Sequence, residues 1–239
     1  MSRSIAMLGW ALPSLGVREG SGYNLNAGEL AAGLVERGHR VAFLRSGVAH
    51  SFAPSLRTTR VEVWRGVVCD EVVNSPMCAP AYFSFGDTGH EQASPELSSL
   101  VLRWLDRVGA EVVHVHSLEG FSHDVMHAIA ASGRRLVCTL HNHWFVCPQI
   151  DLLFRQAEPC TDFDGGLRCE SCVNAPNPER TKAAAAGRRA AERIGRAFSR
   201  PTPDPLGLKA LARWACQTPP APATRELERA VQDIAAEMK

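Results

Sequence analysis

Residues 111–148 contain two short apolar runs that are separated by a helical pattern. The runs, residues 112–115 and 136–140, are rich in β-branched side chains, which is typical of buried strands. The pattern between them extends from about Ser122 to Ser132 and is closed by Gly133. A strand, a helix and a strand at this spacing predict a βαβ unit, in which a right-handed crossover joins two parallel strands.

Histidines stand at the ends of both expected strands. His114 and His116 belong to the first strand, and His141 and His143 follow the second. Because the carboxyl ends of parallel strands form the ligand crevice of open α/β sheets, we expect His116 and His141 to lie side by side at a site. His114 is expected to face the other side of the sheet, where it is packed or hydrogen-bonded, and His143 is expected to support the site from behind.

A glycine-rich loop follows the first expected strand, residues 4–8, and contains Gly20, Ser21 and Gly22. Such a loop can bring backbone N–H groups close to a phosphate or to hydroxyl groups, although glycines in a turn also have a purely steric explanation. The next pattern predicts a helix over residues 23–37 that ends at a glycine. Its expected apolar face consists of Leu25, Leu30, Leu34 and Val35.

The remaining patterns complete one α/β domain. We expect a strand at residues 39–44, a hairpin of strands at 59–64 and 67–73, and a helix that begins at Ser94-Pro95 and ends at Gly109. This order predicts a doubly wound, mostly parallel, Rossmann-like sheet. The expected domain covers residues 1–173, including a Cys-rich loop at 147–172, and a helical tail covers 174–239.

Composition and charge limit the classes of function. Hydrophobic residues make up 45% of the 239 residues and charged residues 21%, as in ordinary globular proteins. The formal net charge of +1 gives no reason to expect a nucleic-acid partner. No apolar run is long enough to span a bilayer, so we expect a cytoplasmic protein. A basic stretch at residues 180–200 suggests either peripheral contact with the inner face of the membrane or, preferably, a solvated helix packed on the domain.

Four of the eight cysteines fall within one loop-like segment: Cys147, Cys160, Cys169 and Cys172. The segment has little apolar material with which to fold, and four thiolates can close a tetrahedral zinc site. We therefore expect structural zinc here, with an iron–sulfur cluster and metal-free or disulfide-linked thiols as the alternatives. Cys138, inside the expected strand at 136–140, is interpreted as a small core residue.

Three runs of sequence resemble the N-terminal domain of family 4 retaining glycosyltransferases of the GT-B fold. They are RGHRVAFL after the first helix, AEVVHVHS at the middle strand and LVCTLHNHWFVCP at the next strand. The last run, followed by spaced cysteines, is similar to one subgroup of that family. The resemblance covers residues 4 to about 172. It implies transfer of a sugar from a nucleotide-diphosphate donor to an acceptor hydroxyl.

The resemblance also implies roles for particular residues. His141 matches a histidine that contacts the donor sugar or phosphate, and we expect it to be catalytic. The loop Gly20-Ser21-Gly22 matches one near the donor phosphates and the acceptor. The residues expected to bind substrate are Gly20, Ser21, Gly22, His116, Ser117, Asn142 and His143.

The family's donor-binding domain has no counterpart among the patterns of this sequence. Two glutamates with the spacing typical of that domain, Glu111 and Glu119, bracket a strand of the first domain and are not taken as its motif. We therefore expect an acceptor-side half that depends on a second domain or a separate donor-domain chain for activity. The alternative is a non-catalytic binding or scaffold protein derived from such a domain. A zinc hydrolase built on the histidines is weaker, because no matching ligand set at helical spacing is present.

Overall fold

The computed structural model describes residues 2–18, 22–79, 81, 93–147, 151–155, 157–172, 182–187 and 189–191. Its main sheet consists of β1 (Ser4–Gly9), β2 (Arg40–Ala49), β3 (Arg57–Trp64), β4 (Val67–Val73), β5 (Val112–Val115) and β6 (Arg135–Cys138). The helices packed around it are α1 (Gly22–Glu36), α2 (Pro95–Val108) and α3 (Asp124–Ala131), and a 3-10 helix, η1 (Pro13–Arg18), precedes α1. The Cys-rich segment forms β7 (Leu153–Phe154), β8 (Glu158–Pro159), η3 (Asp164–Gly166) and α4 (Leu167–Cys172).

The strand order of the main sheet is β3-β4-β2-β1-β5-β6. All neighbouring strands are parallel except β3 and β4, which form the expected antiparallel hairpin at one edge. The chain winds outward from β1 to β2 and β4, and then returns to the other side of β1 to add β5 and β6. The direction of winding therefore reverses between β1 and β5, which is where ligands bind in doubly wound sheets. The predicted doubly wound, mostly parallel α/β fold is confirmed.

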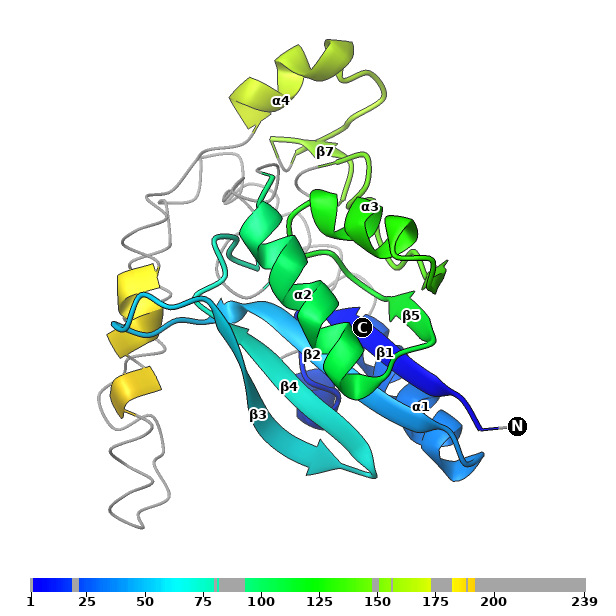
Figure 1. The fold of residues 1–239 in the computed structure, drawn as a ribbon. Coiled ribbons are helices and arrows are strands. Elements are labelled where there is room, and N and C mark those ends of the chain that lie inside the picture. The colour runs from blue at the N-terminus through cyan, green and yellow to red at the C-terminus, as the bar shows by residue number, and fades with distance from the viewer. Residues whose placement is uncertain are drawn as a thin grey trace, which may run out of the picture.

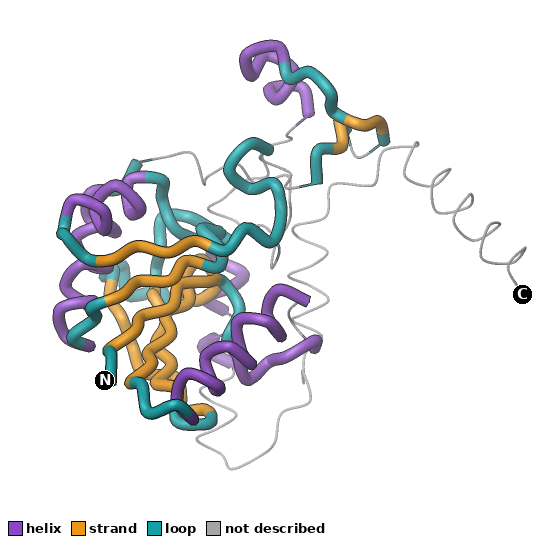
Figure 2. Tube along the Cα trace, turned by 90° about the vertical axis from the view of Figure 1, so that its right-hand side faces the viewer, coloured by secondary structure: helices purple, strands orange, loops and turns teal. Residues whose placement is uncertain are grey.

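Helices cover both faces of the sheet (Figure 1). Alternation along β1 divides the core between them, since Met7 packs with residues of α1 whereas Ala6 and Leu8 pack with residues of α2 and α3. In the view turned by 90°, the strands lie as a layer between helices (Figure 2). None of the helices in the described ranges is both long and apolar enough to cross a membrane.

Local sequence signals set several boundaries where they were expected. Arg65 and Gly66, which join β3 to β4, both have positive φ (46° and 81°), as a tight hairpin turn requires. The Ser94 hydroxyl accepts a hydrogen bond from the backbone N–H of Leu97 and so caps the start of α2. Gly109 ends α2 in the left-handed conformation.

The buried face of α1 differs from the expected one. Leu34 and Val35 do pack against the core, but Leu25 and Leu30 are exposed, so that part of the prediction was wrong. The face that packs on the sheet is made of small residues together with two polar ones, namely Tyr23, Asn24, Ala27, Gly28, Ala31 and Ala32. Small side chains allow the helix backbone to lie close to the sheet, which a stripe of leucines would prevent.

Strand β6 is also less buried than its apolar sequence predicted. Val137 is 41% exposed and Leu140, just beyond the strand, is 69% exposed. Cys138 is exposed as well, so its interpretation as a core residue was wrong. The reason is position, because β6 pairs only with β5 among the described residues and α1 lies over the other end of the sheet.

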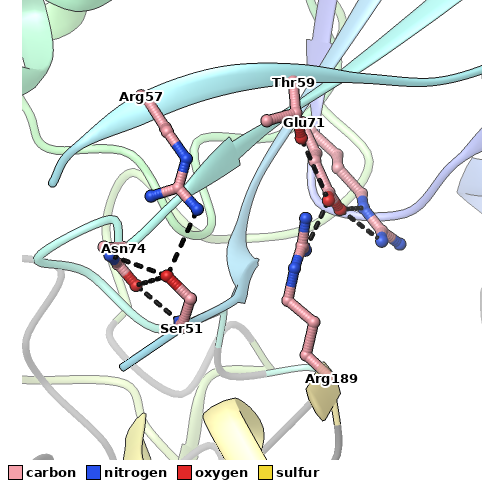
Figure 3. A network of polar contacts seen from close by, with 7 residues as sticks. Ser51, Arg57, Thr59, Glu71, Asn74 and Arg189 are labelled. Carbon is pink, nitrogen blue, oxygen red and sulfur yellow. Dashed lines mark hydrogen bonds and ion pairs between the residues drawn. The ribbon is translucent and has the colours of Figure 1, made fainter. Parts of the chain in front are cut away.

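The described part of the tail lies against the domain. Residues 182–187 and 189–191 are helical, and Ala185 and Ala186 are buried. Arg189 forms an ion pair with Glu71 of β4, a buried carboxylate that also accepts hydrogen bonds from the Arg45 guanidinium (Figure 3). These contacts agree with a helix packed on the domain. The rest of the basic stretch, including residues 192–200, lies outside the described residues.

Candidate functional site

The structure brings His116 and His141 together at the carboxyl ends of β5 and β6. The backbone N–H of His116 donates to the Leu8 carbonyl, which continues the pairing of β5 with β1. Likewise, the Thr139 N–H donates to the Val115 carbonyl and continues the pairing of β6 with β5. The His116 Nδ1 atom consequently lies 3.1 Å from the His141 Nε2 atom, and the two rings are inclined by only 23°.

His114 lies on the same face as His116, and the expectation that it faces the opposite side was wrong. Residues two apart in a strand share a face, and the centroids of the two imidazole rings are 4.1 Å apart. His114 is hydrogen-bonded, as expected, through a 2.7 Å contact between its Nε2 atom and the Thr139 hydroxyl. Three imidazoles therefore form one cluster across β5 and β6.

The start of α1 forms the other side of this site. Gly22 is the first residue of the helix, and the ring of the next residue, Tyr23, lies 5.2 Å from the His141 ring between centroids. Backbone N–H groups of Trp10 and Ala11 donate to the Tyr23 hydroxyl at 3.3 and 3.2 Å, which fixes the helix start against the end of β1. Gly20 and Ser21 lie outside the described residues.

Glu119 is a buried carboxyl group close enough to Tyr23 for the two groups to interact electrostatically. It is 1% exposed, lies in the loop after β5, and accepts a 2.9 Å hydrogen bond from the Ala81 backbone N–H. Burial raises its pKa to about 7, while hydrogen bonds from Ala81 and Ser117 act in the opposite direction. Glu111, from which Glu119 is separated by seven intervening residues, is exposed and paired with Arg3, so the two glutamates have unrelated surroundings.

A close backbone crossing holds the Glu119 loop in place. Gly47 of β2 and Gly120 touch so closely that a Cβ atom built on Gly47 would lie 2.4 Å from the Gly120 Cα atom. The Gly120 carbonyl accepts hydrogen bonds from the hydroxyl groups of Ser46 and Ser75. The end of β2 and the loops that follow β4 and β5 are thus fastened together at the carboxyl edge of the sheet.

The three imidazoles are neutral at physiological pH. Burial lowers the pKa of His116 to about 3, with further lowering from His114 and His141. Burial is also the largest cause of the lowered pKa values of His114 and His141. Each ring therefore has one N–H donor and one bare nitrogen acceptor.

The other residues expected to bind substrate shape the adjoining turns. The Ser117 hydroxyl accepts a hydrogen bond from the Glu119 N–H, and the Asn142 side-chain oxygen accepts one from the Trp144 N–H. The His143 carbonyl accepts bonds from Val146 and Cys147, which closes the turn after β6. Their binding roles stay predictions.

Tyr23 and Glu119 were missed as site residues. Tyr23 directly follows the glycine loop, and Glu119 was considered only as half of a spaced pair. Neither position is distinguished by residue type in the sequence, because what sets both side chains apart is their burial in the folded chain.

We expect Glu119→Gln to stabilise the protein at alkaline pH. A carboxyl group whose pKa is raised from 4.5 to about 7 in the folded state favours folding while it is protonated, and this advantage is lost as pH rises through about 7. Glutamine keeps the acceptor for Ala81 but cannot ionise. The difference in unfolding free energy between the variant and the wild-type protein should therefore be about 3 kcal/mol more favourable to the variant at pH 8 than at pH 4. Urea unfolding of both proteins at the two pH values measures the change, and an equal difference at both would contradict the raised pKa.

Two of the four cysteines of the Cys-rich segment, Cys160 and Cys172, make backbone contacts through their sulfur atoms. The Arg155 backbone N–H lies 3.0 Å from the Cys172 sulfur, and the Cys160 sulfur lies 3.8 Å from the Asp162 carbonyl oxygen. Within the described ranges, no three or more His, Cys, Asp or Glu side chains are grouped so that they could hold a metal ion. Structural zinc at these four cysteines stays a prediction, which elemental analysis of the purified protein would test.

Comparison with known proteins gives a matching family model and a distant likeness to a solved structure. A family model described as Glycosyltransferase Family 4 matches residues 22–159. The solved structure of sucrose-phosphate synthase from Thermosynechococcus elongatus is similar with a TM-score of 0.39 and 14% sequence identity. The match covers 59% of this chain and 33% of that chain, so this protein spans about a third of the synthase structure. No curated protein matches the sequence significantly.

Proposed function

Because this chain belongs to glycosyltransferase family 4, we propose that it forms the acceptor-side half of an enzyme that transfers a sugar from a nucleotide-diphosphate donor to an acceptor hydroxyl. The observation that carries this proposal is the pair of imidazoles, His116 and His141, beside the first turn of α1. All of these groups lie at the carboxyl edge of the sheet, next to the point where the winding reverses.

The start of α1 is suited to the leaving diphosphate. The first N–H groups of a helix have no partners inside the helix, and the helix dipole adds partial positive charge there. Departure of the nucleoside diphosphate increases negative charge on its oxygens, so fixed N–H donors stabilise the transition state more than the ground state. The Tyr23 hydroxyl fixes the position of the helix start relative to the end of β1, because it accepts hydrogen bonds from the backbone there.

His141 is placed to add a side-chain donor at the same centre. It is half-buried, lies over the Tyr23 ring and is neutral, so it would act as a hydrogen-bond donor and not as a cation. A neutral donor stabilises a developing oxyanion or a sugar hydroxyl without binding the charged product as tightly as an imidazolium would. His141 is therefore our candidate catalytic residue.

Binding of the nucleotide would require a second protein surface opposite this edge, in a further domain or in a separate chain. The test is to express this chain together with polypeptides encoded beside it and to measure nucleoside diphosphate release from UDP-glucose, UDP-N-acetylglucosamine and GDP-mannose. We expect nucleoside diphosphate release from at least one donor, at a rate that rises when a cell extract containing acceptor molecules is added. Turnover of none, in complexes that bind a sugar nucleotide, would favour the non-catalytic binding protein.

A further inference from the structure

We propose that His116 is a positioning residue that fixes the tautomer of His141, donating from its Nδ1–H to the His141 Nε2 atom so that His141 carries its proton on Nδ1. The role assigned to that proton in catalysis rests on the proposed function. The tautomer itself is a property of the chain alone.

The contact between the two rings requires one proton and one lone pair. The His116 Nδ1 and His141 Nε2 atoms are 3.1 Å apart, a normal hydrogen-bond distance for two nitrogens. A neutral imidazole carries its proton on one nitrogen only, so the ring that donates here has a bare nitrogen on its other side. The ring that accepts has its N–H on its other side.

The surroundings of His116 decide which ring donates. The side chain is 3% exposed, and its Nε2 atom is buried without a hydrogen-bond partner. If His141 donated, the His116 proton would sit on this Nε2 atom as a buried N–H group with no acceptor. If His116 donates, the Nε2 atom carries only a lone pair. Unpaired buried N–H groups are rarer in proteins than acceptors that are not fully satisfied, so donation by His116 is favoured.

The ring of His116 is held in the orientation that this donation needs. Its backbone N–H is bonded to the Leu8 carbonyl, and the His114 ring lies 4.1 Å away on one side. His114 is itself fixed by its contact with the Thr139 hydroxyl. The lowered pKa values of the three histidines keep the cluster neutral, which preserves one donor and one acceptor per ring.

The consequence is a defined donor in the site. With its Nε2 atom occupied by His116, neutral His141 has a single N–H, on Nδ1, to offer to a ligand oxygen. Without His116, the proton of His141 could occupy either nitrogen, and only part of the population would present the donor. His116 would then act on turnover through His141, without touching the sugar.

The direct test is the tautomer of His141 in protein labelled with 15N in its histidine rings. Two-bond 1H–15N correlation spectra at pH 7 distinguish the two neutral tautomers. Loss of signals in His141→Gln and His116→Asn assigns the two rings among the nine histidines. We expect the pattern of an Nδ1–H ring for both histidines in the wild-type protein. An Nε2–H pattern for His141, or an average of the two patterns, would overturn the proposal.

Two variants at position 116 separate positioning from packing. In His116→Asn, the side-chain amide keeps an N–H donor near the place of Nδ1, so His141 should stay in the Nδ1–H form. In His116→Leu, which keeps the volume and removes the donor, the His141 signals should move toward a mixture of tautomers. Unchanged His141 signals in the Leu variant would contradict the proposal, and if that variant does not fold, the wild-type spectrum still decides.

Kinetics separate this proposal from the proposed function. In an active complex, His116→Leu should lower kcat about tenfold or more with little change in the KM of the sugar nucleotide, and His116→Asn should restore most of the loss. A wild-type Nδ1–H tautomer in a protein without transferase activity would refute the proposed function alone. Full activity together with an Nε2–H tautomer would refute the positioning role alone.

Discussion

Gly47→Ala should destabilise the protein by more than about 4 kcal/mol, enough to unfold a domain of ordinary stability. The added Cβ atom would lie 2.4 Å from the Gly120 Cα atom and 2.5 Å from the Ala79 backbone nitrogen. Both of these are backbone atoms, so no side chain can rotate away to make room. The φ angle of Gly47, +76°, adds a strain that glycine does not have. Relief of the clash would require the end of β2 to separate from the loops after β4 and β5.

Gly109→Ala is the matched control for this substitution. Gly109 also has a left-handed φ of +64°, but a Cβ atom there would meet nothing within 4 Å. It should cost only about 1 kcal/mol, the strain of the backbone conformation. Urea unfolding followed by tryptophan fluorescence compares the two variants with wild type. Equal stability of Gly47→Ala and Gly109→Ala would show that the crossing of Gly47 and Gly120 is not rigid.

The order of the elements was predictable because the signals that define it are local. The Ser94 cap, the Gly109 helix end and the Arg65-Gly66 turn each depend on residues that are adjacent in sequence. Burial was harder to predict, since it depends on which element lies above a given face. Leu25 and Leu30 are apolar yet exposed because Ala27 and Ala31 occupy the contact with the sheet.

The candidate site was predictable only where topology determines it. His116 and His141 meet because they follow neighbouring parallel strands, which the βαβ pattern implied. Tyr23 and Glu119 could not be found in this way. Glu119 lies near Tyr23, in a loop whose path depends on the close contact of two glycines 73 residues apart in the chain, Gly47 and Gly120.

Loss of the His141 imidazole should have the largest effect on activity. In complexes that turn over a sugar nucleotide, His141→Ala should lower kcat by about 10²- to 10³-fold, the usual cost of removing one donor to a developing oxyanion. Because the side chain is half-buried and follows β6, the last strand of the main sheet, its removal should change stability much less than activity. His127→Ala is the matched control, since His127 is exposed on α3 and belongs to no part of the site.

The ratio of nucleoside diphosphate release by His141→Ala and His127→Ala, measured at saturating donor, is the most direct test of sugar transfer at this edge of the sheet. We predict that His127→Ala keeps the wild-type rate while His141→Ala falls at least a hundredfold below it. Equal rates for the two variants would contradict a transfer centre built on His116, His141 and the start of α1.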